Sequence, residues 1–141
     1  MKNKFFIFKF ILILFLTTNL LANDLEISST EVKIDKKNSK VILKGDIKAV
    51  DDNKNILQAD EAYYLKDKDL LNSIGLTKII TSENYILESS NVVFDNKNKI
   101  IKSDNPTKIL DPDGNIFSVS MFNYNSIKNI LFSKGNIKLE D

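Results

Sequence analysis

The sequence predicts an all-β protein built from four stacked repeats. Residue types recur every thirty positions without a gap, β-branched residues are plentiful, and Gly, Asn or Asp interrupts the apolar runs at regular intervals. A fixed period of this length indicates a stacked repeat, in which each unit buries its apolar face only against its neighbours. The recurrence is seen in three series: Gly45, Gly75, Asn105 and Gly135; Lys48, Lys78, Lys108 and Lys138; and Ile34, Tyr64, Phe94 and Tyr124.

Each repeat begins with an apolar run that predicts a strand with one bend. The apolar or small positions are spaced by two, three and two residues. The step of three breaks the alternation of a strand, so a bulge or corner must return the later pair to the inner face. These positions are Ile27, Ser29, Val32 and Ile34; Leu57, Ala59, Ala62 and Tyr64; Leu87, Ser89, Val92 and Phe94; and Phe117, Val119, Phe122 and Tyr124.

A polar turn and a second strand complete each repeat. The turns, at residues 35–38, 66–69, 95–98 and 125–126, are rich in Asn and Asp, which tolerate left-handed backbone. The second run alternates around a central Gly or Asn, which predicts another kink. Turns at 51–53 and 111–114 separate units. The second runs are Val41, Leu43, Ile47 and Ala49; Leu71, Ser73, Thr77 and Ile79; Ile101, Ser103, Thr107 and Ile109; and Leu131, Ser133, Ile137 and Leu139.

A helical interpretation is disfavoured, because spacings of three and four residues are rare and Asn and Asp interrupt every candidate segment. We therefore expect four stacked, bent hairpins with one continuous apolar seam along their inner side.

Residues 1–22 have the pattern of a signal peptide. A basic start is followed by an apolar stretch from Phe5 to Leu16, and Ala22 offers a cleavage site. Cleavage leaves residues 23–141, which the length predicts to be a single domain. An uncleaved membrane anchor is the alternative, although Lys9 and residues 17–19 make the segment more broken than the roughly 20 apolar residues of a stable span.

The composition excludes several classes of function. All twenty basic residues are Lys, and three of them lie in the signal, so the remaining 17 face 19 acidic residues and leave a net charge of −2. Nucleic-acid binding is therefore not expected. The absence of Cys excludes disulfides, and the absence of both Cys and His removes the usual metal ligands and general base. Glu31, Glu61 and Glu83 have no recognisable catalytic partner, so we expect neither an enzyme nor a cofactor.

The inward positions form the candidate ligand surface, an apolar groove. Their alternative role is an ordinary core, and in an open groove the same side chain serves both purposes. The Lys48 series alternates with inward positions, so we expect a solvated outer face there, with contacts to ligand phosphates or sugars as the alternative. The predicted groove residues are Ile34, Val41, Leu57, Tyr64, Leu71, Leu87, Val92, Phe94, Ile101, Phe117, Phe122, Tyr124 and Leu131.

Residues 42–48 (ILKGDIK), 57–64 (LQADEAYY) and 111–115 (DPDGN) resemble the OstA-like domain, and residues 134–137 (KGNI) match its recurrent strand ending. The resemblance covers residues 24–141. This family includes periplasmic lipopolysaccharide carriers of the LptA type and the N-terminal domains of LptD-type outer-membrane assembly proteins. The resemblance implies an open, twisted β-jelly roll with a V- or U-shaped section, whose apolar interior shields the acyl chains of lipid A.

The resemblance also implies a non-enzymatic lipid carrier or bridge in lipopolysaccharide transport, located in the periplasm and associated with the outer membrane. Its implied partners are lipopolysaccharide, other OstA-like Lpt components joined by edge-strand pairing, and head-to-tail copies of the chain. Uncapped repeats leave edge strands that can recruit such partners. Three alternatives stay open: a truncated N-terminal domain of an LptD-like protein, an LptC-like membrane-tethered relay, and a structural β-solenoid with a closed, dry seam.

Overall fold

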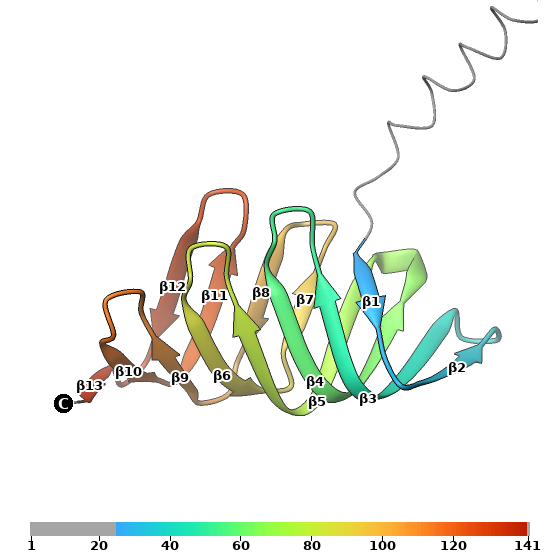
Figure 1. Ribbon diagram of the computed structural model, residues 1–141, viewed down its shortest axis with the longest axis horizontal. Coiled ribbons are helices and arrows are strands. Elements are labelled where there is room, and N and C mark those ends of the chain that lie inside the picture. Colours follow the sequence, from blue (N-terminus) through green and yellow to red (C-terminus); the bar gives the residue numbers. More distant parts are fainter. Residues whose placement is uncertain (1–24, 141) are drawn as a thin grey trace, which may run out of the picture.

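The computed structural model describes residues 25–140, which form one antiparallel sheet of thirteen strands (Figure 1). The expected signal peptide, residues 1–22, lies outside the described residues. The elements are β1 (Glu26–Ser28), β2 (Glu31–Asp35), β3 (Lys40–Val50), β4 (Ile56–Leu65), a 3-10 turn η2 (Lys66–Lys68), β5 (Leu70–Ile80), β6 (Ile86–Ser90), β7 (Val93–Asp95), β8 (Ile100–Ser103), β9 (Thr107–Leu110), β10 (Ile116–Val119), β11 (Met121–Asn125), β12 (Ile130–Lys134) and β13 (Lys138–Glu140). Within residues 25–140 no helix has the length and apolar character needed to cross a membrane.

The sheet is folded along a corner into two walls. Wall 1 contains β1, β6, β9, β10 and β13, together with residues 47–50 of β3, 56–59 of β4 and 77–80 of β5. Wall 2 contains β2, β7, β8, β11 and β12, together with residues 40–44, 61–65 and 70–74 of the same three strands. Of the described strands, only β3, β4 and β5 pass unbroken through the corner, and the predicted bend in every run is confirmed.

The corner recurs with the thirty-residue period of the sequence. The pairing register shifts between Lys44 and Ile47 in β3 and between Ala59 and Glu61 in β4. Gly45, Gly75 and Gly135 all take positive φ values at this position. The fourth member, Asn105, bends the chain without a positive φ and is followed by Pro106, which has no amide hydrogen to contribute to the ladder.

The hairpin turns form two rims along the open side of the folded sheet, opposite the corner (Figure 1). On the rim of wall 1, the side chain that opens each turn accepts a hydrogen bond from the amide four residues later: Asp51 from Asn55 (2.8 Å), Thr81 from Tyr85 (3.0 Å) and Asp111 from Asn115 (2.8 Å). On the rim of wall 2, left-handed residues recur every thirty positions at Ser39, Asp69, Lys99 and Asn129. The predicted polar turns are thus confirmed at both rims.

Candidate functional site: an apolar groove between two walls

The inner face of each wall carries a row of apolar residues that are cross-strand partners from the first strand to the last. The row of wall 1 is Ile27, Ala49, Leu57, Ile79, Leu87, Ile109, Phe117 and Leu139. The row of wall 2 is Ile34, Val41, Tyr64, Leu71, Phe94, Ile101, Tyr124 and Leu131. Facing side chains of the two rows line the space between the walls along the whole sheet.

The predicted groove residues all lie on this inner side. The wall 2 row consists entirely of predicted residues, and Leu57, Leu87 and Phe117 belong to the wall 1 row. Val92 and Phe122 are buried in the same core, closer to the corner. The structure therefore brings the predicted set together, and its contact with a ligand stays a prediction.

The middle of the groove is filled by its own side chains, whereas both ends are open. Leu57, Leu71 and Phe94 have no exposed surface, because the two walls pack directly against each other there. At the ends of the rows, Ile34 is 66% exposed and Leu139 is 61% exposed. Equivalent positions of the repeat thus form a closed core in the centre and an accessible apolar surface at both ends.

A cavity opens at each end of the rows. The N-terminal mouth has a volume of about 360 Å³. The C-terminal mouth has a volume of about 330 Å³. Both volumes fall at the lower end of the range for small-ligand pockets, about 300–1,000 Å³. The N-terminal mouth is lined by Ile27, Ser28, Ser29, Val32, Val41, Leu43 and Tyr64. The C-terminal mouth is lined by Tyr85, Ile109, Phe117, Val119, Asn129, Leu131, Ser133 and Ile137.

Buried hydroxyl groups occupy the narrow bottom of the groove beside the corner. Thr77 Oγ1 donates to Ser73 Oγ (2.6 Å), and Thr107 Oγ1 donates to Ser89 Oγ (2.9 Å). Ser103 Oγ donates to the Ser90 carbonyl (2.7 Å), which belongs to the bend. Small side chains let the walls converge, and their hydroxyls satisfy polar groups that a bent ladder leaves unpaired. The two apolar rows therefore lie above these hydroxyls, on the side of the groove away from the corner.

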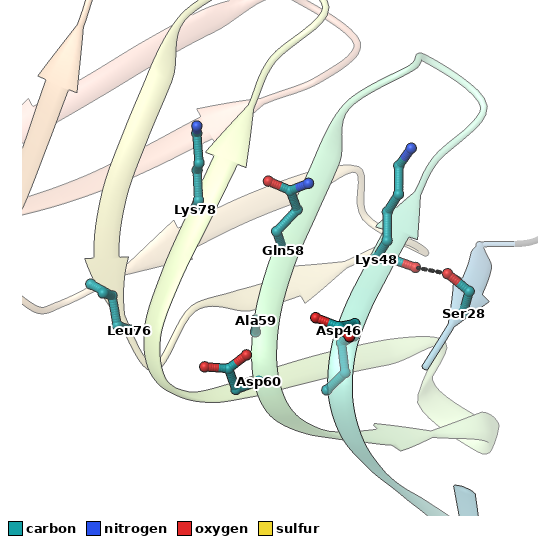
Figure 2. Close-up of a pocket in the computed structure, with 9 residues that line it drawn as sticks. Ser28, Asp46, Lys48, Gln58, Ala59, Asp60, Leu76 and Lys78 are labelled. Carbon is teal, nitrogen blue, oxygen red and sulfur yellow. Dashed lines mark hydrogen bonds between the residues drawn. The ribbon is translucent and has the colours of Figure 1, made fainter. Parts of the chain in front are cut away.

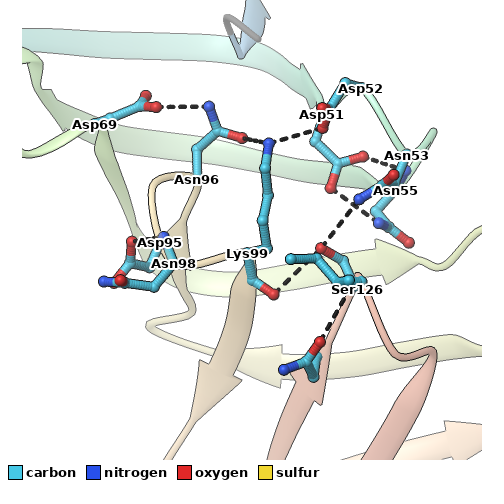
Figure 3. Close-up of polar contacts among 12 residues, drawn as sticks. Asp51, Asp52, Asn53, Asn55, Asp69, Asp95, Asn96, Asn98, Lys99 and Ser126 are labelled. Atoms are coloured by element: carbon cyan, nitrogen blue, oxygen red, sulfur yellow. Dashed lines mark hydrogen bonds and ion pairs between the residues drawn. The ribbon is translucent and has the colours of Figure 1, made fainter.

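Polar contacts join the two rims across the open side (Figure 3). We call the following three pairs the rim contacts. Lys99 Nζ lies 2.7 Å from Asp52 Oδ1, Asn53 Nδ2 donates to Ser126 Oγ (3.5 Å), and Asn129 Nδ2 donates to Glu83 Oε1 (3.0 Å). The sequence does not predict these contacts, because a repeat shows where turns occur but not which turns of the two walls oppose each other.

The lysine series lies on the outer face of wall 1, as predicted. Lys48, Lys78, Lys108 and Lys138 are exposed, and Gln58 lies between Lys48 and Lys78 in the cross-strand row. Lys48, Gln58 and Lys78, whose side chains Figure 2 shows, line an open pocket of about 480 Å³, and Ser28 Oγ donates to the Lys48 carbonyl there (3.5 Å). Among the described residues, no group of three or more His, Cys, Asp or Glu side chains is placed to hold a metal ion.

The curled antiparallel sheet and its apolar interior define a β-jelly roll, the fold that the resemblance to the OstA-like domain implies. No protein-family model matches the sequence. No curated protein matches it either. Among solved structures, the chain is similar to LptH from Pseudomonas aeruginosa, the LptA-homologous periplasmic component of the lipopolysaccharide transport device. The TM-score is 0.67 at 12% sequence identity, over 84% of this chain and 95% of LptH. The predicted resemblance to LptA-type proteins is therefore confirmed at the level of the fold.

Proposed function

We propose that this chain is a non-enzymatic carrier in lipopolysaccharide transport that holds lipid acyl chains between wall 1 and wall 2. The observation that carries the proposal is the pair of apolar rows, which face each other along the sheet and end in two open mouths. An acyl chain requires apolar surface rather than a particular side chain, and gains about 25 cal/mol for each Å² of apolar area buried. The fold shared with a lipopolysaccharide transport component supports this class of lipid.

The packed middle of the groove belongs to the empty state of such a carrier. Leu71, Phe94 and Ile101 have no exposed surface, so a lipid enters the middle only when the walls separate. Three continuous strands, β3, β4 and β5, join the walls through the corner. Elsewhere in the described residues, the chain forms two separate strands where it crosses the corner, one in each wall. The corner is therefore the hinge in our proposal. When the walls separate, the core side chains lose their contacts with one another and contact the acyl chains instead.

The ends of the sheet are the proposed sites of assembly. β1 and β2 are edge strands at one end, and β12 and β13 are edge strands at the other. Because neighbouring strands alternate in direction, β2 of a second copy fits beside β12, and β1 fits beside β13, with antiparallel pairing at both positions. This junction continues both apolar rows, with Ile34 following Leu131 and Ile27 following Leu139. It also covers side chains that a single copy exposes, and a homologous jelly roll in another Lpt component offers the same edges.

We further propose that residues 1–22 are a cleaved signal and that residues 23–141 act as one domain in the periplasm, next to the outer membrane. The pattern of the N-terminal sequence supports export. The mass of the protein purified from its native cells tests this step. A mature N-terminus at Asn23 is expected, whereas an intact Met1 would favour the membrane-tethered relay.

Photo-cross-linking tests the carrier function. A photoreactive phenylalanine analogue at Phe94 reports on the middle of the groove, and one at Phe117 reports on the C-terminal mouth. Gln58, on the outer face of wall 1, is the matched control. Lipopolysaccharide should cross-link at the two inner positions and not at Gln58. Folded protein that gives no cross-link at either inner position would instead favour a structural β-solenoid with a closed seam.

A further inference from the structure

We propose that the rim contacts form a clasp that must open before a lipid reaches the middle of the groove. The inference rests on the proposed carrier function and adds a gate to it. Each rim contact joins a turn of wall 1, at residues 51–55 or 81–85, to a turn of wall 2 that follows β7 or β11. These turns cap the two walls, and the fully buried part of the two rows lies between the walls.

The clasp covers the middle of the groove and leaves its ends accessible. The N-terminal mouth is lined by residues of β1 to β4 and of the link between β1 and β2, and neither Lys99 nor Asp52 lines it. Asn129, a member of the rim contacts, lines the C-terminal mouth and so marks where the closed part begins. A lipid can therefore occupy a mouth while the rims are joined, but the fully buried section requires them to part.

The chemistry of the clasp suits a contact that breaks and reforms. The side chains of Lys99 and Asp52 are 13% and 32% exposed, so water reaches their ion pair when the rims move apart. Asp52 is the more exposed partner, so its carboxylate is hydrated once the rims separate. Glu83 and Asn129 are both exposed as well. Lys99 Nζ also donates to Asn96 Oδ1 (3.1 Å), a contact within wall 2 that opening of the clasp leaves in place.

Two tyrosines of the inner row are linked to the clasp. Tyr64 donates to Asp69 Oδ1 (2.6 Å), whose Oδ2 accepts from Asn96 Nδ2 (2.6 Å), and Asn96 Oδ1 accepts from Lys99 Nζ (3.1 Å). In the same repeat position, Tyr124 donates to Asn129 Oδ1 (3.1 Å).

Tyr64 also lines the N-terminal mouth. An acyl chain that displaces these rings therefore disturbs the residues that hold the rims together, and ligand entry is coupled to opening.

A reversible covalent link across the rims tests the clasp. The chain contains no cysteine, so Asp52→Cys with Lys99→Cys provides a single thiol pair, which a reducible bis-methanethiosulfonate reagent joins. The control pair is Asp52→Cys with Ser82→Cys. It joins two turns of wall 1 that are already in contact, since the Ser82 amide donates to Asn55 Oδ1 (2.8 Å). Photoreactive analogues at Phe94 and Phe117 report lipopolysaccharide in the middle and in the C-terminal mouth.

Linking residues 52 and 99 should reduce the Phe94 cross-link at least tenfold while the Phe117 cross-link persists. Reduction of the linker should restore the Phe94 signal, and the control pair should leave both signals unchanged. An undiminished Phe94 cross-link in the linked protein overturns the clasp and leaves the carrier function standing. Folded, reduced protein without a cross-link at either position overturns the carrier function, and the clasp with it.

Discussion

Thr30 and Gly45 face each other across the corner of the sheet, where the Thr30 amide donates to the Gly45 carbonyl (2.9 Å). Gly45 has a φ of +75°, and a Cβ at this position would lie 2.9 Å from Thr30 Oγ1. Gly75, thirty residues later, has a φ of +76° but nothing within 4 Å of such a Cβ. The two glycines share a backbone conformation and differ in the space around it.

Gly45→Ala should therefore destabilise the protein more than Gly75→Ala. Both substitutions place an L side chain in left-handed backbone, at a cost of about 1–2 kcal/mol. Gly45→Ala also displaces Thr30 at the corner, which adds about 1 kcal/mol or more. Urea unfolding followed by circular dichroism measures both variants, and equal losses of unfolding free energy would contradict the close approach at Gly45.

Phe122→Asp should unfold the protein or abolish lipid loading. Phe122 is fully buried between the walls, and an unpaired buried charge costs several kcal/mol, a large part of the roughly 5–15 kcal/mol of a typical domain. Asn123→Asp adds the same charge one residue later, on the outer face, and should be tolerated. Circular dichroism and lipopolysaccharide cross-linking provide the readouts. If the Phe122→Asp protein is folded and still cross-links to lipopolysaccharide, the assignment of inner and outer faces is wrong.

Acid should weaken the turn that begins at Asp111. The side-chain amide of Asn115 is the main cause that lowers the pKa of Asp111 below its ordinary value of 3.8; desolvation opposes this shift and the amides of Asn115, Asp113 and Gly114 assist it. A lowered pKa in the folded state means that the carboxylate contributes stability above pH 3.8. This contribution is lost as the pH falls through the folded-state pKa.

An NMR titration of the carboxyl carbons tests this relation. The midpoint of Asp111 should lie below 3.8 and rise toward it in Asn115→Ala. Asp111→Asn should reduce the loss of unfolding free energy that occurs as the pH falls through the folded-state pKa of Asp111. A midpoint that Asn115→Ala leaves unchanged would contradict the role of this hydrogen bond.

Ile34→Asp should block head-to-tail assembly while leaving the fold intact. Ile34 is exposed on the inner face of the edge strand β2, where the proposed junction continues the apolar row from Leu131. A charge there would be buried against apolar side chains in the assembly and solvated in the single copy. Lys33→Asp, on the outer face of the same strand, is the control. Sedimentation velocity at increasing concentration should show assembly of the native protein and of the control, and identical behaviour of all three would refute the junction.

The thirty-residue period predicts the architecture well because each bend leaves a mark in the sequence. The step between Ala59 and Ala62 breaks the alternation of β4, and the register of the sheet shifts at that step. The sequence cannot distinguish Ile34 from Leu57, although one is largely exposed and the other fully buried. Their difference depends on the presence of a neighbouring wall and repeat, which is a property of the assembled sheet.

The rim contacts are even harder to predict from the sequence than the burial of single residues. Asp52 and Lys99 are 47 residues apart and belong to turns of different walls. Their contact depends on the angle at which the walls meet, and no local pattern records that angle. At Asn105 the difference between the repeat pattern and the structure is smaller. Asn105 replaces the glycine of the other repeats, yet it bends the chain without a left-handed backbone.

Intermolecular NOEs test the location of the acyl chains most directly. Protein labelled at its Ile, Leu and Val methyl groups in a deuterated background, mixed with protonated lipopolysaccharide, would report which methyls contact acyl methylenes. We expect NOEs to Leu71 and Ile79, on the inner faces of wall 2 and wall 1, and none to Ile42 and Val93 on the outer face of wall 2. Acyl NOEs confined to Ile42 and Val93 would contradict it.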